Sequence, residues 1–218
     1  MGSRHRAGAD LQHVRWIGGG SVAGKSTVAR QLAADHGLRL YHTEPFSKYV
    51  GRADPGATPL LQGFMAMDMD ERWVNRSPAV MLETFHGFQG EGFRLVLEDL
   101  RALPADPPVL AEGFSLLPRL VAPLLSRPRQ AVWLLPTPEF RRTAFESRGS
   151  TWTIPAKTSD PQRLWRICSR AISCSRSSFE PTRERLGYRP WTSTAAPMWP
   201  RRLPGWGRRW GCDGAQPN

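Results

Sequence analysis

The stretch Gly19-Gly20-Ser21-Val22-Ala23-Gly24-Lys25-Ser26-Thr27 sets the architecture that we expect for the rest of the chain. It fits the pattern G-x-x-x-x-G-K-[ST], which is typical of a phosphate-binding loop. Glycine allows tight turns and lets the backbone approach phosphates closely, and successive amides in such a turn form an anion nest. The pattern therefore predicts that these nine residues hold a nucleoside triphosphate. Lys25 would contact the β- and γ-phosphates, and the Ser26 hydroxyl would bind Mg²⁺.

The residues on either side of the loop have the composition of a strand and a helix. Before it, His13-Val14-Arg15-Trp16-Ile17 is rich in β-branched and aromatic residues, which favour a strand. After it, apolar residues recur at helical spacing from Val28 to Ala33, and Gly37 follows where a helix commonly ends. Such a helix would point its positive N-terminal end at the phosphates.

Two further strands are expected to end in an acid. Residues 38–42 alternate apolar and polar and are followed by Thr43-Glu44. Because the carboxyl ends of strands face the ligand crevice of an open α/β sheet, Glu44 is a candidate for substrate contact, Mg²⁺ organisation or base chemistry. A solvated loop carboxylate is an equal alternative. Residues 107–113 form an apolar run that closes on Glu112-Gly113, the form of a Walker-B element, and Glu112 is expected to assist the metal. Its alternative is a strand-end charge in solvent.

Residues 45–107 are expected to be a helical insert between the second and third strands. Thr58-Pro59 and Ser77-Pro78 each place a capping residue before a proline at the first helical position. Residues 69–76 combine a tryptophan with several charges, so Arg72 and Arg76 either grip an anionic substrate or belong to a solvated helix end.

A fourth strand is expected at residues 130–135, followed by a helix that starts at Thr137-Pro138-Glu139 and carries arginines. Arg142 or Arg148 is a candidate to stabilise the transferring phosphoryl group, whose developing charge needs cations. The alternative is that these arginines are solvated. Residues 149–162 are expected to be a lid that excludes water from the nucleotide.

This order of elements resembles the P-loop kinases of nucleosides, nucleotides and other small metabolites, over about residues 12–162. The stretches Trp16-Ile17-Gly18-Gly19-Gly20-Ser21 and Ala131-Val132-Trp133-Leu134-Leu135-Pro136-Thr137-Pro138 are most similar to nucleotide-kinase-like proteins of actinobacteria. The resemblance implies an α/β three-layer sandwich, a P-loop NTPase fold with a parallel sheet of order 2-3-1-4-5. It also implies ATP with Mg²⁺ as cofactors and a small-molecule acceptor as partner. The match is close for the loop and loose for Glu112 and Arg148.

The composition restricts the remaining function classes. No run of 18 apolar residues is present, and residues 1–12 are polar and basic, so we expect no membrane partner, a disordered lead-in and a cytoplasmic location. The three cysteines lie late in the chain and the five histidines early, which argues against a zinc site. No guanine-binding N-K-x-D or ABC-type L-S-G-G-Q motif occurs. A non-catalytic nucleotide-dependent regulatory module remains an alternative to a kinase.

The last part of the chain differs from the rest. Residues 163–218 contain 11 Lys and Arg against 3 Asp and Glu, and five of the nine Trp, with no helical or strand period that we can identify. This basic tail is either a nucleic-acid-binding arm, a disordered segment, or a product of translation in the wrong frame.

The frameshift alternative makes structural predictions. With synonymous codons, the shifted frame can encode an amphipathic helix over residues 163–181 and a strand and turn over residues 187–194. If the tail is frameshifted, the sheet should lack its fifth strand and the tail should pack poorly. Sequencing the encoding DNA decides whether the shifted frame exists.

Overall fold

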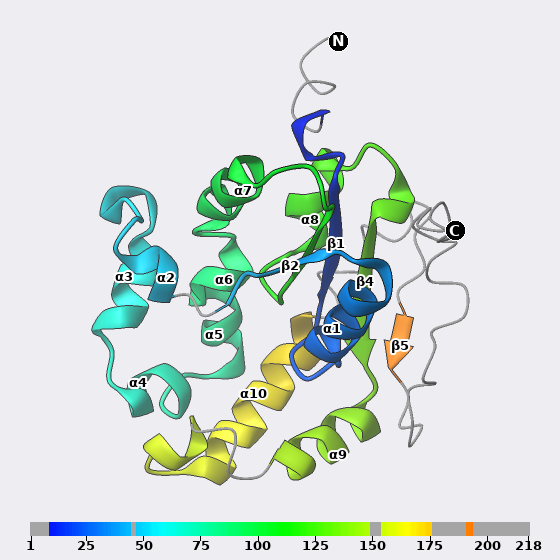
Figure 1. The fold of residues 1–218 in the computed structure, drawn as a ribbon. Helices are drawn as coiled ribbons and strands as arrows, with labels where there is room; N and C mark the ends of the chain where they lie inside the picture. The colour runs from blue at the N-terminus through cyan, green and yellow to red at the C-terminus, as the bar shows by residue number, and fades with distance from the viewer. Residues whose placement is uncertain (1–8, 45–46, 149–153, 176–190, 194–218) are drawn as a thin grey trace.

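The computed structural model describes residues 9–44, 47–148, 154–175 and 191–193, which contain a parallel sheet of five strands (Figure 1). The strands are β1 (Val14–Gly19), β2 (Arg39–His42), β3 (Val109–Glu112), β4 (Ala131–Pro136) and β5 (Trp191–Ser193). Their order is β2-β3-β1-β4-β5, and each neighbouring pair is parallel. The expected α/β class and the order of the first four strands are confirmed, and this architecture is consistent with a P-loop-like fold.

Helices cover both faces of the sheet, because side chains alternate along each strand. On β4, Ala131, Trp133 and Leu135 pack in one core cluster, while Val132 and Leu134 pack in the other. The helix α1 (Lys25–His36) covers the second cluster; α7 (Phe93–Ala102) and α8 (Pro118–Val121) cover the first (Figure 1). The result is three layers, with β1 buried at the centre.

The expected insert is helical, and it carries a third core cluster of its own. Its helices are α2 (Ser47–Val50), α3 (Pro59–Ala66), α4 (Met69–Trp73), α5 (Pro78–Thr84), α6 (His86–Gln89) and α7. The Ser77 hydroxyl accepts a hydrogen bond from the Val80 amide at the start of α5, as the sequence predicts. Among the helices in the described residues, none combines the length and the apolar run needed to cross a bilayer.

The prediction that the fifth strand is missing is wrong. Residues 191–193 pair with Leu134, Leu135 and Pro136 of β4. Three residues are too few to show a strand period, and backbone pairing does not depend on one. Without β5, β4 would leave its backbone groups open at the sheet edge.

A helix crosses the tail boundary that is expected at residue 163. The helix α10 (Pro161–Ser175) runs through it and packs on α5 (Figure 1). Leu164, Ile167 and Cys168 recur at helical spacing and are buried in the third cluster, where burial raises the pKa of the Cys168 thiol to about 12. The part of the tail that the structure describes is therefore ordered by the residues as written, and poor packing is not observed there. Residues 176–190 and 194–218 lie outside the described residues.

The structure also bears on the expected start of the domain and on the expected lid. Leu11, in the 3-10 helix η1 (Ala9–Leu11), is buried in the first cluster, and Asp10 pairs with Arg101. The ordered domain therefore begins by residue 9 and not at residue 13. Of the expected lid, residues 149–153 lie outside the described residues, and the rest contains the 3-10 helix η6 (Pro155–Lys157) and the start of α10.

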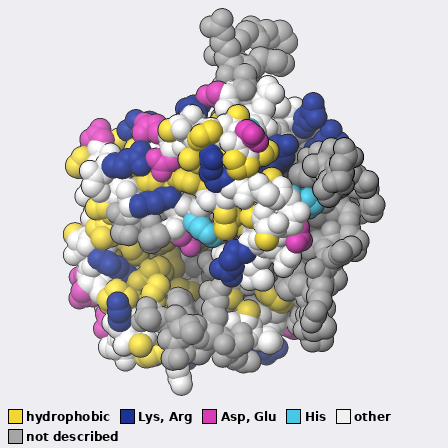
Figure 2. Space-filling view, viewed as in Figure 1, with side chains coloured by type: hydrophobic (Ala, Val, Ile, Leu, Met, Phe, Trp, Pro, Cys, Tyr) yellow, Lys and Arg dark blue, Asp and Glu magenta, His cyan; other side chains and the backbone are white. Residues whose placement is uncertain are grey.

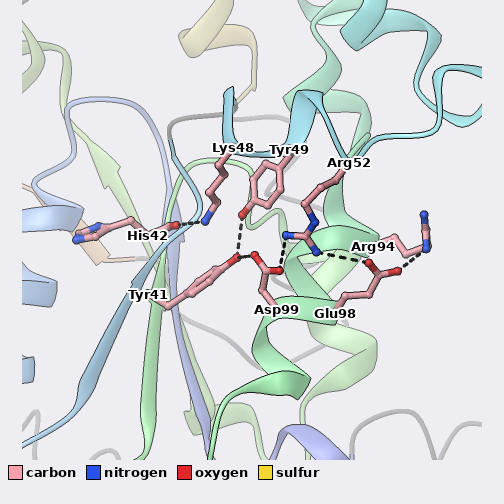
Figure 3. Close-up of polar contacts among 8 residues, drawn as sticks. All are labelled: Tyr41, His42, Lys48, Tyr49, Arg52, Arg94, Glu98 and Asp99. Atoms are coloured by element: carbon pink, nitrogen blue, oxygen red, sulfur yellow. Dashed lines mark hydrogen bonds and ion pairs between the residues drawn. The ribbon is translucent and has the colours of Figure 1, made fainter.

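A polar network ties β2 to the insert (Figure 3). The Tyr41 hydroxyl donates to Asp99 on α7 at 2.7 Å and lies 2.9 Å from the Tyr49 hydroxyl, and Arg52 donates to the other Asp99 oxygen at 2.6 Å. The Lys48 ammonium lies 4.2 Å and 4.6 Å from the centres of the Tyr41 and Tyr49 rings. Burial raises the pKa of Tyr49 to about 12 and lowers that of Lys48. This network fixes α2 beside the carboxyl end of β2.

We expect Asp99→Asn to lower the free energy of unfolding at pH 7 by about 1–3 kcal/mol, because a partly buried, charge-assisted acceptor is lost. Burial alone would raise the pKa of Asp99, but the hydrogen bonds from Tyr41 and Arg52 outweigh it and the pKa lies below its usual value of 3.8. A depressed carboxyl pKa stabilises the fold above the unfolded value and loses that contribution as the pH falls through the folded value. In urea unfolding, the difference between variant and wild type should therefore shrink below about pH 4.

The exposed Asp35→Asn on α1 is the control and should change the stability by less than about 0.5 kcal/mol. A constant Asp99→Asn effect from pH 7 to pH 3 would contradict the role of the carboxylate charge.

Candidate phosphate-binding site

The loop at residues 19–27, the candidate phosphate-binding loop, packs directly against β4. Gly19, the last residue of β1, has φ +119°, and a Cβ added there would lie 2.1 Å from the Leu134 carbonyl oxygen. The Gly20 amide then donates to the same oxygen at 2.9 Å. Only glycine combines this backbone conformation with this closeness, so the first glycine of the motif is required by packing.

The remainder of the loop turns into α1 through left-handed conformations. Val22 has φ 60° and Gly24 has φ 81°. A β-branched residue in this region is strained, and such strain gathers at functional sites. The first backbone bond of α1 runs from the Val28 amide to the Gly24 carbonyl, so the amides of the first turn face the loop.

Lys25 lies inside the loop. It is 8% exposed, and its Nζ donates to the Gly20 carbonyl oxygen at 2.9 Å. The loop thus wraps around its own positive charge, next to the positive end of α1. This arrangement favours a bound anion with several negative oxygens.

The acid at the end of β3 meets the loop. Ser26 Oγ donates to Glu112 Oε1 at 2.9 Å, and Glu112 is 5% exposed. His42 Nδ1 lies 2.6 Å from the same oxygen. The structure therefore brings Ser26 and Glu112 together across the sheet and does not leave Glu112 in solvent.

Sequence reasoning missed His42. The available signal was register, since His42 and Glu112 are the last residues of adjacent parallel strands and pair directly. Its side chain is 43% exposed, while that of Glu112 is 7% exposed. His42 thus forms the outer part of the pair and Glu112 the inner part.

Glu44 lies at the rim of the site. It is exposed and accepts a hydrogen bond from the Phe114 amide at 3.2 Å. Thr43, which precedes Glu44, is fully buried, and its Oγ1 lies 3.1 Å from Ser115 Oγ. A Cβ on Gly113 would lie 1.8 Å from Thr43 Oγ1, so this crossing of the two strand ends also requires glycine.

The arginines follow β4 on α9 (Pro138–Arg148). Arg142 is exposed, and the side chain of Arg148 lies outside the described part of the chain. Arg141, which was not selected as a site residue, is 5% exposed. The Thr137 hydroxyl accepts from the Phe140 amide at 3.1 Å and caps this helix as expected. No contact between described residues brings Arg142 against the loop.

The residues at the loop suit Mg²⁺ better than a transition metal. Within residues 9–44, 47–148, 154–175 and 191–193, no three His, Cys, Asp or Glu side chains form a group that could hold a metal by themselves. Ser26 and Glu112 supply a hydroxyl and a carboxylate oxygen. Mg²⁺ is commonly held by one or two such protein oxygens together with water and substrate phosphates.

No protein-family model, curated protein sequence or solved structure matches this chain. The argument for function therefore depends on the loop, on the Ser26–Glu112 contact and on the strand order.

Proposed function

We propose that this chain is an ATP-dependent kinase that transfers the γ-phosphoryl group of ATP to a small metabolite, nucleoside or nucleotide. The contact between Ser26 Oγ and Glu112 Oε1 carries the proposal. A phosphate loop alone supports only triphosphate binding. A loop hydroxyl paired with a buried strand-end carboxylate would also hold a divalent metal, which would supply the charge neutralisation that phosphoryl transfer requires.

The residues of the loop would bind and orient ATP. Lys25 and the amides of residues 20–27 would hold the β- and γ-phosphates, and Ser26 and Glu112 would hold Mg²⁺. When bound, the metal would neutralise charge on the phosphate oxygens. His42 would act as a positioning residue, because its ring holds the Glu112 oxygen that also contacts Ser26.

The acceptor would enter from the carboxyl ends of β2 and β3. Glu44 lies at this rim, where it would contact or activate the acceptor. Arg142 or Arg148 would stabilise the transferring phosphoryl group from the side of β4. Both arginines are proposed for this role because they lie on α9, the helix that follows β4.

The proposal is tested by titrating ATP into the full chain by calorimetry, with and without Mg²⁺. Wild type should bind ATP more tightly with Mg²⁺, and Glu112→Gln should reduce that gain by roughly 10-fold or more, since a charge-assisted metal contact is lost. Glu98→Gln, on α7, is the matched control and should leave the gain unchanged. Equal ATP affinities with and without Mg²⁺ in wild type would contradict the proposal.

Turnover separates a kinase from a module that only binds the nucleotide. ATP consumption should rise when the correct acceptor is added to wild type, and Glu112→Gln should abolish the rise. ATP binding without consumption, over a panel of nucleosides, nucleotides and sugars, would favour the regulatory alternative.

A further inference from the structure

Within the part of the chain that the structure describes, Arg76 is a buried cation without a counter-ion. It follows α4, in the turn before α5, and is 8% exposed. Its Nη1 is buried and has no hydrogen-bond partner among the described residues. Among the ion pairs between described residues, none includes Arg76. A guanidinium stays charged at any physiological pH, and buried charges are normally paired.

Three acids that precede Arg76 in the sequence are committed elsewhere. Asp68 accepts from the Glu71 amide and Glu71 from the Asp68 amide, each at 2.8 Å, in the capping box of α4. Asp70 accepts from the Ser159 amide at 2.8 Å, and hydrogen bonding from the Ser159 side chain and then from this amide lowers the Asp70 pKa. None of these three acids forms an ion pair with Arg76.

The charge of Arg76 affects the pKa of a buried histidine, His86. His86 is 1% exposed, and its pKa is lowered to about 4, first by burial and then by the nearby Arg76. Arg72, four residues before Arg76, adds a second positive charge whose guanidinium lies 5.2 Å from the centre of the Phe64 ring. The site is therefore electropositive within an apolar setting.

Aromatic rings connect this site with the phosphate-binding loop. The His86 ring lies 4.6 Å from that of Phe85, which lies 5.8 Å from that of Phe114. Phe114 in turn donates its amide to Glu44 at the rim. Over the insert helices, hydrophobic side chains reach the surface with Lys and Arg side chains beside them (Figure 2). Arg76 thus lies across one aromatic cluster from the end of β3.

We propose that Arg76 binds an oxyanion of the acceptor, a phosphate or carboxylate group, with the rings of the third cluster beside it. The inference that an oxyanion binds here depends only on the buried guanidinium. The inference that this oxyanion belongs to the acceptor rests on the proposed function. Arg76 presents a planar fork of donors that matches two oxygens of either group. The acceptor is therefore an anionic molecule and not a neutral one.

The test uses the full chain carrying Lys25→Met, which removes the lysine of the loop, so that anion binding there is weakened. Inorganic phosphate and succinate, at constant ionic strength, are the probes for the two oxyanions, and thermal unfolding and calorimetry are the readouts. The added variants are Arg76→Met, Arg76→Lys and, as control, Arg94→Met, whose side chain is 69% exposed on α7.

At least one probe should raise the unfolding midpoint of the Lys25→Met chain and of its Arg94→Met form. Arg76→Met should weaken binding of that probe roughly 10- to 100-fold, and Arg76→Lys should weaken it less. Arg76→Met should also unfold at a higher midpoint in chloride alone, because an unpaired buried charge is gone. In NMR titrations the bound probe should raise the pKa of His86 from about 4, as it offsets the charge of Arg76.

Equal stabilisation of the Lys25→Met chain with and without Arg76, or no stabilisation by either probe, would overturn the proposal. The result is independent of ATP. If wild type fails to bind ATP with Mg²⁺, the kinase proposal fails while an oxyanion site at Arg76 still stands.

Discussion

Lys25→Met should weaken ATP–Mg²⁺ binding by about 100-fold or more, since charge-assisted hydrogen bonds to phosphate contribute roughly 1.5–3 kcal/mol each. Lys25 is 8% exposed and its ammonium lies within the loop, 2.9 Å from the Gly20 carbonyl oxygen. Methionine keeps the unbranched buried stem and removes only the charge. The loop should therefore keep its shape and lose its strongest donor. Calorimetric titration of ATP at saturating Mg²⁺ gives the affinity of each form.

Arg30→Ala is the control for this experiment. Arg30 is exposed on the same helix, α1, so the variant removes one positive charge without touching the loop. Its ATP affinity should stay within about 2-fold of wild type at physiological salt, where exposed charges are screened. If Lys25→Met bound ATP as tightly as Arg30→Ala does, residues 19–27 would not be the nucleotide site.

Gly19→Ala should destabilise the fold by about 3 kcal/mol or more and abolish ATP binding, because overpacking and backbone strain act together. The added Cβ would lie 2.1 Å from the Leu134 carbonyl oxygen, and φ at this residue is +119°. Relief requires β1 to separate from β4, which would also break the hydrogen bond from the Gly20 amide to Leu134. Urea unfolding and ATP titration measure the two effects.

Gly37→Ala separates strain from overpacking. Gly37 also has a positive φ, +62°, but a Cβ there meets nothing within 4 Å. This variant should lose only about 1 kcal/mol, the usual cost of a left-handed alanine, and keep ATP affinity. If both glycine variants lost the same stability, the close approach of Gly19 to Leu134 would not matter energetically.

The features that were predictable from sequence are those set by local pattern. The glycines and Lys25 in one short motif, the apolar strands around it and the capped helices of the insert all carry their information within a few residues. Glu112 was identifiable because a strand that ends in an acid is itself a local pattern. The order of the first four strands came from resemblance, and it agrees with the structure.

The features that were not predictable depend on residues far apart in the chain. His42 joins Glu112 only through strand register, and β5 forms because β4 offers an open edge. Arg76 looked like one of several charges near Trp73 until its burial was known, and the Arg101–Asp10 pair links residues that no local pattern connects. For α10 the local pattern of Leu164, Ile167 and Cys168 was present but was hidden by the basic composition around it.

The position of β1 has a consequence for the order in which the fold can form. Val14 pairs with Val109 and Trp16 with Ala131, so the central strand is made long before either neighbour. During synthesis the chain passes through α1 and the insert helices, whose contacts are local and quick to form, while β1 has no strand to pair with. The sheet can begin to assemble only after β3 has emerged, and β4 can join it only after residue 136 has emerged. The insert helices therefore precede the sheet, and the loop acquires its shape only when Gly20 reaches Leu134.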